Sequence, residues 1–286
     1  MTIVDSHQHF WNPAEQDLPP PPAKYAPLDR AFLPADLQPD LSKCGVDYTV
    51  LVQGYPQTDA SNRFLFRQAN QTAFVAGVVA WADLEDTDRL CRQLDDLATE
   101  PKFVGIRHIV QEEPDPQFLL REPVLASLRE LAHRAVPYDM VVYQRHLPVV
   151  IQTVDQVPEL RVVIDHIGKP DIAGGDTAGW ERDIAELAQR PLVHCKLSGV
   201  ATEADWKTWR PADIEPCIER VVECFGFDRL MYGSDWPVCL LATDYGRFWQ
   251  TLQSILAGIG EENHTKLFGN TAAHFYGLTL PAAQSD

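Results

Sequence analysis

The segment TIVDSHQHF (residues 2–10) is a short apolar run that ends in two histidines separated by one residue. Side chains two positions apart in a β-strand point to the same side. His7 and His9 therefore face one way if the strand continues through them. Two such imidazoles can bind a metal ion or donate hydrogen bonds to one developing charge. A surface pair near a terminus is the ordinary alternative, and the rest of the sequence has to decide.

This segment is the first of eight of its kind. The eight runs are TIVDSH (2–7), YTVLVQ (48–53), FVAGVVAW (74–81), FVGIRH (103–108), DMVVYQ (139–144), RVVIDH (161–166), LVHCKLS (192–198) and RLMYGSD (229–235). Several are nearly continuous in Val, Ile and Leu, which is typical of strands buried on both faces of a parallel sheet.

Helix-like segments separate most of these runs. They span residues 59–71, 87–98, 122–134, 176–189 and 213–225. The last is predicted to begin with Asp213 as its N-cap. Eight strands that alternate with helices predict a single (β/α)8 TIM-type barrel, and we expect one domain over residues 1–286.

One segment departs from this alternation. Residues 12–39 hold PPPP at 19–22 and further prolines at 13, 27, 34 and 39, so we expect no persistent helix there. The segment is too long for a simple loop after the first strand. We interpret it as either disordered or a cover over the active site, and we favour the cover.

The composition is that of a soluble globular protein, with 286 residues, 45% hydrophobic and 23% charged. The net charge of −17 disfavours nucleic acid and anionic membranes as partners. We find no apolar run of 18 residues and no signal-peptide pattern. The six scattered cysteines form no C-x-x-C pair. We therefore expect a cytoplasmic protein, and the oligomeric state stays open.

Polar side chains gather at the ends of seven of the eight runs. They are His7 and His9, Gln53, Arg107 and His108, Tyr143 and Gln144, Asp165 and His166, Lys196 and Ser198, and Ser234 and Asp235. The starts of the runs are mostly Tyr, Phe, Leu and Arg. Because barrel active sites lie at the C-terminal ends of the strands, this asymmetry favours a catalytic pocket over packing residues.

The order VDSHQHFW, VGIRH, IDHIGKP, KLSG, MYGSDWPV resembles the amidohydrolase superfamily, and within it the metal-sparing lactonase group. That group contains sugar-lactone hydrolases of the fuconolactonase and rhamnonolactonase types and 2-pyrone-4,6-dicarboxylate lactonase. H-x-H alone is a weak signal. Combined with D-H-x-G-K-P and Y-G-S-D-W-P at strand ends, it is a specific one.

The resemblance also implies a set of metal ligands. The positions that hold metal in the wider superfamily correspond to His7, His9, His166 and Asp235, whereas Gln144 or Tyr143 replaces a further histidine expected at the fifth strand. An amide is a poor zinc ligand, so a two-metal site looks incomplete. One Zn²⁺ could still bind opportunistically to His7, His9 and Asp235. The resemblance implies that turnover requires no cofactor.

The expected reaction is hydrolysis of a lactone ring. Asp235 is the predicted base that activates water, and His7, His9 and His166 are the predicted donors to the oxyanion. The predicted substrate contacts are Arg107, Gln53, Gln144, Lys196, Trp236 and Trp81. The shortage of basic residues at the strand ends, together with the net charge, favours a neutral aldonolactone over a dicarboxylate.

Two other interpretations stay open. A metal-dependent amidohydrolase or decarboxylase of the same superfamily would need a tightly held zinc with a fourth protein ligand, such as His146. A barrel that binds sugars or lactones without turnover would keep the pocket and lack the activity.

Overall fold

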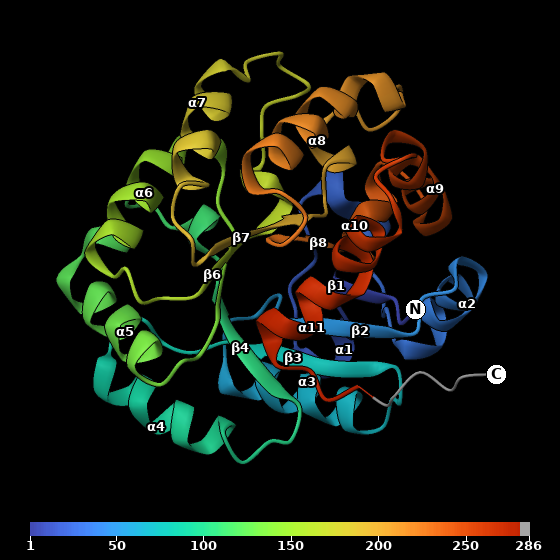
Figure 1. The fold of residues 1–286 in the computed structure, drawn as a ribbon. Helices are drawn as coiled ribbons and strands as arrows, with labels where there is room; N and C mark the ends of the chain where they lie inside the picture. Colours follow the sequence, from blue (N-terminus) through green and yellow to red (C-terminus); the bar gives the residue numbers. More distant parts are fainter. Residues whose placement is uncertain (281–286) are drawn as a thin grey trace.

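The computed structural model describes residues 1–280, so the last six residues of the predicted domain lie outside the described residues. Eight parallel strands form one sheet in chain order. They are β1 (Val4–Gln8), β2 (Tyr48–Val52), β3 (Val75–Ala80), β4 (Phe103–His108), β5 (Tyr138–Met140), β6 (Val162–Ile164), β7 (Val193–Leu197) and β8 (Leu230–Tyr232). Each predicted run overlaps one of these strands. The predicted (β/α)8 barrel is confirmed (Figure 1).

Contacts between the first and last strands close the barrel. Gln8 pairs in parallel with Trp236. The amide of His9 donates to the carbonyl of Trp236 at 2.7 Å, and the amide of Asp235 donates to the carbonyl of His7 at 2.8 Å. The residues that close the barrel are thus the candidate site residues themselves or their direct neighbours. Closure therefore brings together side chains more than 200 positions apart in the sequence.

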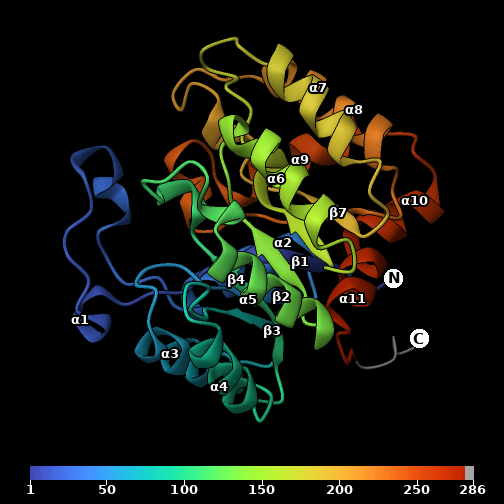
Figure 2. The ribbon, with the colours of Figure 1, turned by 90° about the vertical axis from the view of Figure 1, so that its left-hand side faces the viewer.

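Helices cover the outside of the barrel (Figure 1). They are α2 (Pro34–Cys44), α3 (Asp59–Asn70), α4 (Thr87–Leu97), α5 (Glu122–His133), α6 (Leu147–Gln156), α7 (Ala178–Leu187), α8 (Pro211–Phe225), α9 (Tyr245–Ile255) and α10 (Glu261–Thr265). A last helix, α11 (Thr271–Tyr276), lies across the end of the barrel at which the strands begin (Figures 1 and 2). Within residues 1–280, every helix is too short or too polar to cross a bilayer.

Two expectations about helix boundaries are wrong. Helix α8 begins at Pro211, and Asp213 lies inside its first turn, where its carboxylate accepts the Arg210 amide at 2.7 Å. The proline-rich segment does contain helix, because α1 (Pro13–Gln16) lies in it and α2 begins there. Pro34 occupies the first turn of α2, where the missing N–H would have no helical partner anyway.

Backbone hydrogen bonds join the residue just before the proline-rich segment to a residue within it. Trp11 and Phe32 exchange two backbone hydrogen bonds of 3.1 and 2.9 Å. Between them lies a short 3-10 helix, η1 (Ala23–Leu28), in which the ring of Tyr25 lies 5.8 Å from that of Trp206. Figure 2 shows this segment, in dark blue, on the side of the barrel where the strands end. A cover over the active site would occupy this place.

Candidate active site

Four of the predicted side chains converge at the C-terminal end of the barrel. Nε2 of His7 and Nε2 of His9 are 3.1 Å apart. Oδ1 of Asp235 lies 3.7 Å from the first and 3.3 Å from the second. His166, which follows β6, brings its Nε2 to 3.9 Å from the same oxygen. One carboxylate oxygen thus faces three imidazoles, all of them buried.

Left-handed backbone conformations position two of these residues. Asp235 has a φ of 56°. His166, Ile167 and Lys169 have φ values of 54°, 50° and 50°, and Gly168 between them has 74°. Each non-glycine residue in this region costs roughly 1–2 kcal/mol. The run turns the chain back sharply after β6, and such strain concentrates at functional sites.

Hydrogen bonds on the outer side of two rings fix which nitrogen faces the centre. Nδ1 of His9 lies 2.8 Å from the carbonyl of Val52, which can only accept, so Nδ1 holds the proton and a neutral ring presents a lone pair at Nε2. Nδ1 of His166 lies 2.9 Å from the hydroxyl of Ser198, which can donate to it and leave an N–H at Nε2. This placement disagrees with the expectation that His9 donates to an oxyanion.

Burial strongly affects the ionisation of the four converging side chains. Burial lowers the pKa of His7 well below its ordinary value, lowers the pKa of His9, and lowers the pKa of His166 to about 4. Burial alone would raise the pKa of Asp235, but the neighbouring rings of His166, His9 and His7 outweigh it and hold that pKa below its usual range. At neutral pH an ionised carboxylate therefore faces neutral imidazoles.

Arg107 brings a permanent positive charge to the centre. Its Nη1 lies 3.3 Å from Nε2 of His7 and 3.2 Å from Oδ2 of Asp165, and its Nη2 donates to the carbonyl of Gln53. Arg107 is thus a predicted substrate residue that the structure brings into contact with the four converging side chains.

A second charged cluster lies beneath His7. Nζ of Lys196 is 2.5 Å from Oδ2 of Asp139, 3.1 Å from Oδ1 of Asp165 and 3.1 Å from Nδ1 of His7. Lys196 and both aspartates have no exposed surface. Lys196 is thus a buried counter-charge to two carboxylates, and its contact with a substrate stays a prediction. Asp165 contacts only buried groups, which are Arg107, Lys196 and His7.

A comparison with known proteins identifies the family. A family model described as Amidohydrolase matches residues 4–278. The chain belongs to the amidohydrolase family. It is 40% identical over 286 residues to an L-fucono-1,5-lactonase of Burkholderia ambifaria, with 98% of this chain and 97% of the relative covered. The superfamily membership predicted from the strand-end motifs is confirmed.

Two crystal structures of an amidohydrolase from Burkholderia multivorans share the fold. The form with bound HEPES has a TM-score of 0.91 at 33% identity, and the form with bound zinc has a TM-score of 0.89 at 34% identity. In both comparisons 98% of this chain and 100% of the other are covered. The likeness therefore extends over the whole barrel.

The other predicted substrate contacts have different partners in this amidohydrolase. Gln53 is fully buried and its amide donates to the next carbonyl along the chain. Gln144 uses both ends of its amide on the 171–176 loop, with two hydrogen bonds of 3.0 Å. The ring of Trp236 packs against two phenylalanine rings, and Trp81 is held through its backbone by α3. Contact of these four residues with a substrate stays a prediction.

The central donor set fits a single zinc ion. Ligand atoms of His7, His166 and Asp235 lie within 4.8 Å of one another. Nε2 of His166 can ligate a metal only in the tautomer in which Nδ1 donates to the Ser198 hydroxyl. Tetrahedral zinc with bonds of about 2.0 Å separates its ligands by roughly 3.3 Å. The distance of 3.1 Å between Nε2 of His7 and Nε2 of His9 agrees with this separation. The lone pair that Nε2 of His9 presents toward Asp235 is also the kind of donor that zinc binds. His146, the fourth ligand considered from the sequence, instead accepts the Tyr143 amide at Nδ1.

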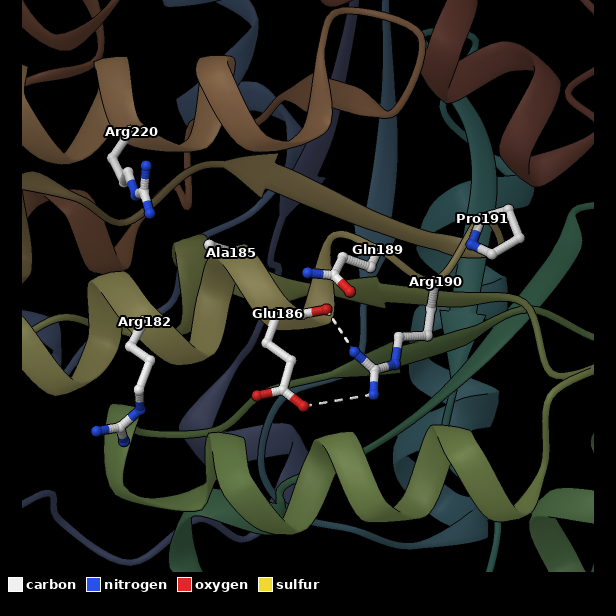
Figure 3. Close-up of a pocket in the computed structure, with 7 residues that line it drawn as sticks. All are labelled: Arg182, Ala185, Glu186, Gln189, Arg190, Pro191 and Arg220. Carbon is white, nitrogen blue, oxygen red and sulfur yellow. Dashed lines mark hydrogen bonds and ion pairs between the residues drawn. The ribbon is translucent and has the colours of Figure 1, made fainter.

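The surface hollow in Figure 3 lies elsewhere, on the outer side of α7 and α8. It has a volume of about 670 Å³ and is lined by Arg182, Arg190 and Arg220 with Glu186. Each arginine is already paired with a carboxylate close by in space. None of the strand-end residues lines this hollow, so it is separate from the candidate active site.

Two charged residues of the mouth were not assigned to the site from the sequence. From the sequence, Lys169 appears only within the D-H-x-G-K-P motif, and Glu203 is not singled out. The structure pairs them, with Nζ of Lys169 3.6 Å from Oε1 of Glu203. Neither lies on a strand, so neither periodicity nor the strand-end rule marks them. Lysine does not favour the left-handed conformation that Lys169 adopts, so the residue type does not predict it.

Proposed function

We propose that this amidohydrolase hydrolyses the ring ester of a sugar aldonolactone. The observation that supports this most directly is the convergence of the Asp235 carboxylate with three buried imidazoles at the end of the barrel. The reaction needs a base for water and donors for an oxyanion, and both kinds of group are present there. The resemblance to an L-fucono-1,5-lactonase over nearly the full length favours a sugar lactone.

In the proposed mechanism Asp235 takes a proton from the attacking water. The second O–H of that water donates to Nε2 of His9, which lies 3.3 Å from the carboxylate oxygen. The water oxygen bonds to the carbonyl carbon, and the carbonyl oxygen becomes an oxyanion. Donation from Nε2 of His166 and from Arg107 stabilises that charge. Removing one such donor typically costs about 2.7–4 kcal/mol in the barrier.

Ring opening completes the reaction. The bond between the carbonyl carbon and the ring oxygen breaks, and the ring oxygen leaves as an alkoxide tethered to the product. The proton that Asp235 accepted returns to this alkoxide. The products are a carboxylic acid and a hydroxyl group on one open chain, and the carboxylate of Asp235 is restored.

We further propose that turnover does not depend on a metal. Zinc held by the histidines and Asp235 would supply Lewis acidity toward the substrate carbonyl. Arg107 already provides a fixed positive charge 3.3 Å from Nε2 of His7. Gln144, which stands where the superfamily has a further histidine, is engaged with the 171–176 loop. The zinc in the relative's crystal belongs to that protein, and here we regard zinc as an optional occupant.

The proposed substrate is neutral. A dicarboxylate would need several cations at the centre, whereas Lys196 is neutralised beneath His7 by two aspartates and Arg107 is paired with Asp165. The net charge of −17 disfavours polyanions further. On the same charge, and on six unpaired cysteines, we propose a cytoplasmic protein without a nucleic-acid partner.

A pH-indicator screen of pentono- and hexonolactones, with and without chelator, tests this proposal. We expect release of acid from at least one aldonolactone well above the rate of spontaneous hydrolysis, in both conditions. Zinc-dependent decarboxylation or amide hydrolysis with no lactone turnover would support the metal-dependent alternative. Saturable lactone binding without turnover would support the non-catalytic barrel.

A further inference from the structure

An ion pair lies at the mouth of the barrel, away from the four converging side chains. Lys169 follows the turn after β6, and Glu203 ends a 3-10 helix, η6 (Ala201–Glu203), after β7. The side chains are 15% and 17% exposed, so both are largely shielded yet reach solvent. The same two loops hold His166 and Ser198.

Backbone hydrogen bonds fix this pair in place. The amide of Lys169 donates to the carbonyl of His166 at 2.9 Å, and its carbonyl accepts the Gln144 amide at 3.4 Å. The carbonyl of Glu203 accepts the Ala173 amide at 3.0 Å. Each residue is therefore positioned by the barrel loops rather than by its partner.

The ion pair between Lys169 and Glu203 is too weak to account for the backbone strain in the turn beside it. A partly exposed ion pair typically contributes 0–1 kcal/mol. The left-handed turn that presents His166 and Lys169 holds three non-glycine residues, each at a cost of roughly 1–2 kcal/mol. A turn this costly, with a lysine at its exposed end, is better explained by a function of that lysine than by stability.

The pair lies next to the catalytic group along the chain, since Lys169 is three residues from His166 and Glu203 is five residues from Ser198. After burial and Asp235, the charge of Lys169 is the next influence on the pKa of His166. Burial raises the pKa of Glu203, Lys169 opposes this, and the charge of Asp235 adds to it.

Aromatic rings flank the pair. Nζ of Lys169 lies 5.2 Å from the ring centre of Tyr143. The rings of Tyr25 and Trp206 are 5.8 Å apart, one from the proline-rich segment and one from the loop that carries Glu203. Burial, and then the charges of Glu112, Tyr25 and Glu203, raise the pKa of Tyr143 to about 12. Apolar walls with a few charged groups are typical of a small-molecule site.

We propose that Lys169 and Glu203 bind two neighbouring hydroxyl groups of the lactone, with Lys169 donating to one and Glu203 accepting from the other. This inference rests on the proposed function and narrows it to polyhydroxylated lactones. An unsubstituted lactone leaves both charges unused, and a substrate carboxylate is repelled by Glu203. Sites built to bind a substrate hydroxyl reject analogues that lack it.

Kinetics on two substrates test this subsite. Lys169→Met and Glu203→Gln are assayed on the best aldonolactone of the screen and on δ-valerolactone, which has the ring ester and no hydroxyl groups. Loss of a hydrogen bond to a charged group lowers kcat/KM about 10- to 100-fold. We expect that loss on the aldonolactone and a change of less than about threefold on δ-valerolactone. Lys207→Met, an exposed lysine in the loop of Glu203, serves as the control.

The two possible failures are distinguishable. Equal losses on both substrates, or no loss on either, would overturn the subsite while leaving lactonase activity intact. If the wild-type protein hydrolyses neither lactone, the proposed function fails. In that case the affinity of the Asp235→Asn protein for the aldonolactone still tests the subsite. Adding Lys169→Met to that protein should raise Kd at least tenfold, and an unchanged Kd would overturn the subsite.

Discussion

Nε2 of His9 lies 3.3 Å from Oδ1 of Asp235, while Nδ1 of the same ring donates to the carbonyl of Val52 at 2.8 Å. The contact between His9 and Asp235 therefore joins two acceptors. Two acceptors at this distance repel unless a donor or a cation lies between them. A water molecule has two O–H groups and satisfies both, with its own lone pair left free for a carbonyl carbon. This relationship makes His9 a partner of Asp235 in holding water rather than a third oxyanion donor.

Ser198→Ala is expected to lower kcat by about fivefold and to change KM by less than twofold. The hydroxyl of Ser198 lies 2.9 Å from Nδ1 of His166, and as the donor in this contact it leaves the N–H of that ring at Nε2. Loss of one hydrogen bond of this kind costs about 1 kcal/mol. Steady-state kinetics on the aldonolactone measure the effect, with the exposed Ser42→Ala as control. An unchanged kcat would show that Ser198 does not position the ring.

Exhaustive chelation is expected to leave kcat within about twofold of the untreated enzyme. Arg107 and His166 stabilise the oxyanion without help from an ion, and Arg107→Met should lower kcat at least about 100-fold as the loss of an oxyanion donor. Metal content and activity are measured on the same samples before and after chelation. A tenfold loss that added zinc restores would contradict the proposed independence from metal.

His194 should make the protein less stable in mild acid. Its ring lies outside the site, 4.7 Å from that of Phe275, and burial lowers its pKa from 6.5 to about 4. Between these values the unfolded chain holds the proton and the folded chain does not. The free energy of unfolding therefore falls as the pH falls through this window, by about 2 kcal/mol between pH 7.5 and pH 5.

Urea denaturation of His194→Leu at those two pH values measures this contribution. The variant should lose about 2 kcal/mol less than the wild type over the same interval. The other buried histidines are present in both proteins, so their effects cancel. His133→Leu, an 82% exposed histidine, controls for the loss of a surface imidazole. Equal losses in wild type and His194→Leu would contradict the assignment.

Much of the site was predictable because it follows from strand geometry. His7, His9, His166 and Asp235 all follow apolar runs, and parallel strands in a barrel end on one side. Chain order and the closing contacts between β1 and β8 then bring them together. The strand period and the position of a residue at the end of a strand can both be read from a single sequence.

The remaining features depend on contacts that a single sequence does not display. Lys196 follows the strand period, yet its ammonium lies beneath His7 because Asp139 and Asp165 neutralise it there. The left-handed turn from His166 to Lys169 contains Ile167, a β-branched residue that disfavours this conformation. Residue type therefore predicts an extended backbone where the fold imposes a turn. Glu203 lies beyond the end of a strand, and only its ion pair with Lys169 in the structure relates it to the site.

The most direct test of the account is kcat of Asp235→Asn on a sugar aldonolactone, measured beside the wild type at neutral pH. The amide keeps the size of the side chain and cannot accept a proton from water. The account predicts a loss of at least about 10³ in kcat with little change in KM. A loss of less than tenfold in a folded variant would remove Asp235 from the role of base and contradict the proposed mechanism.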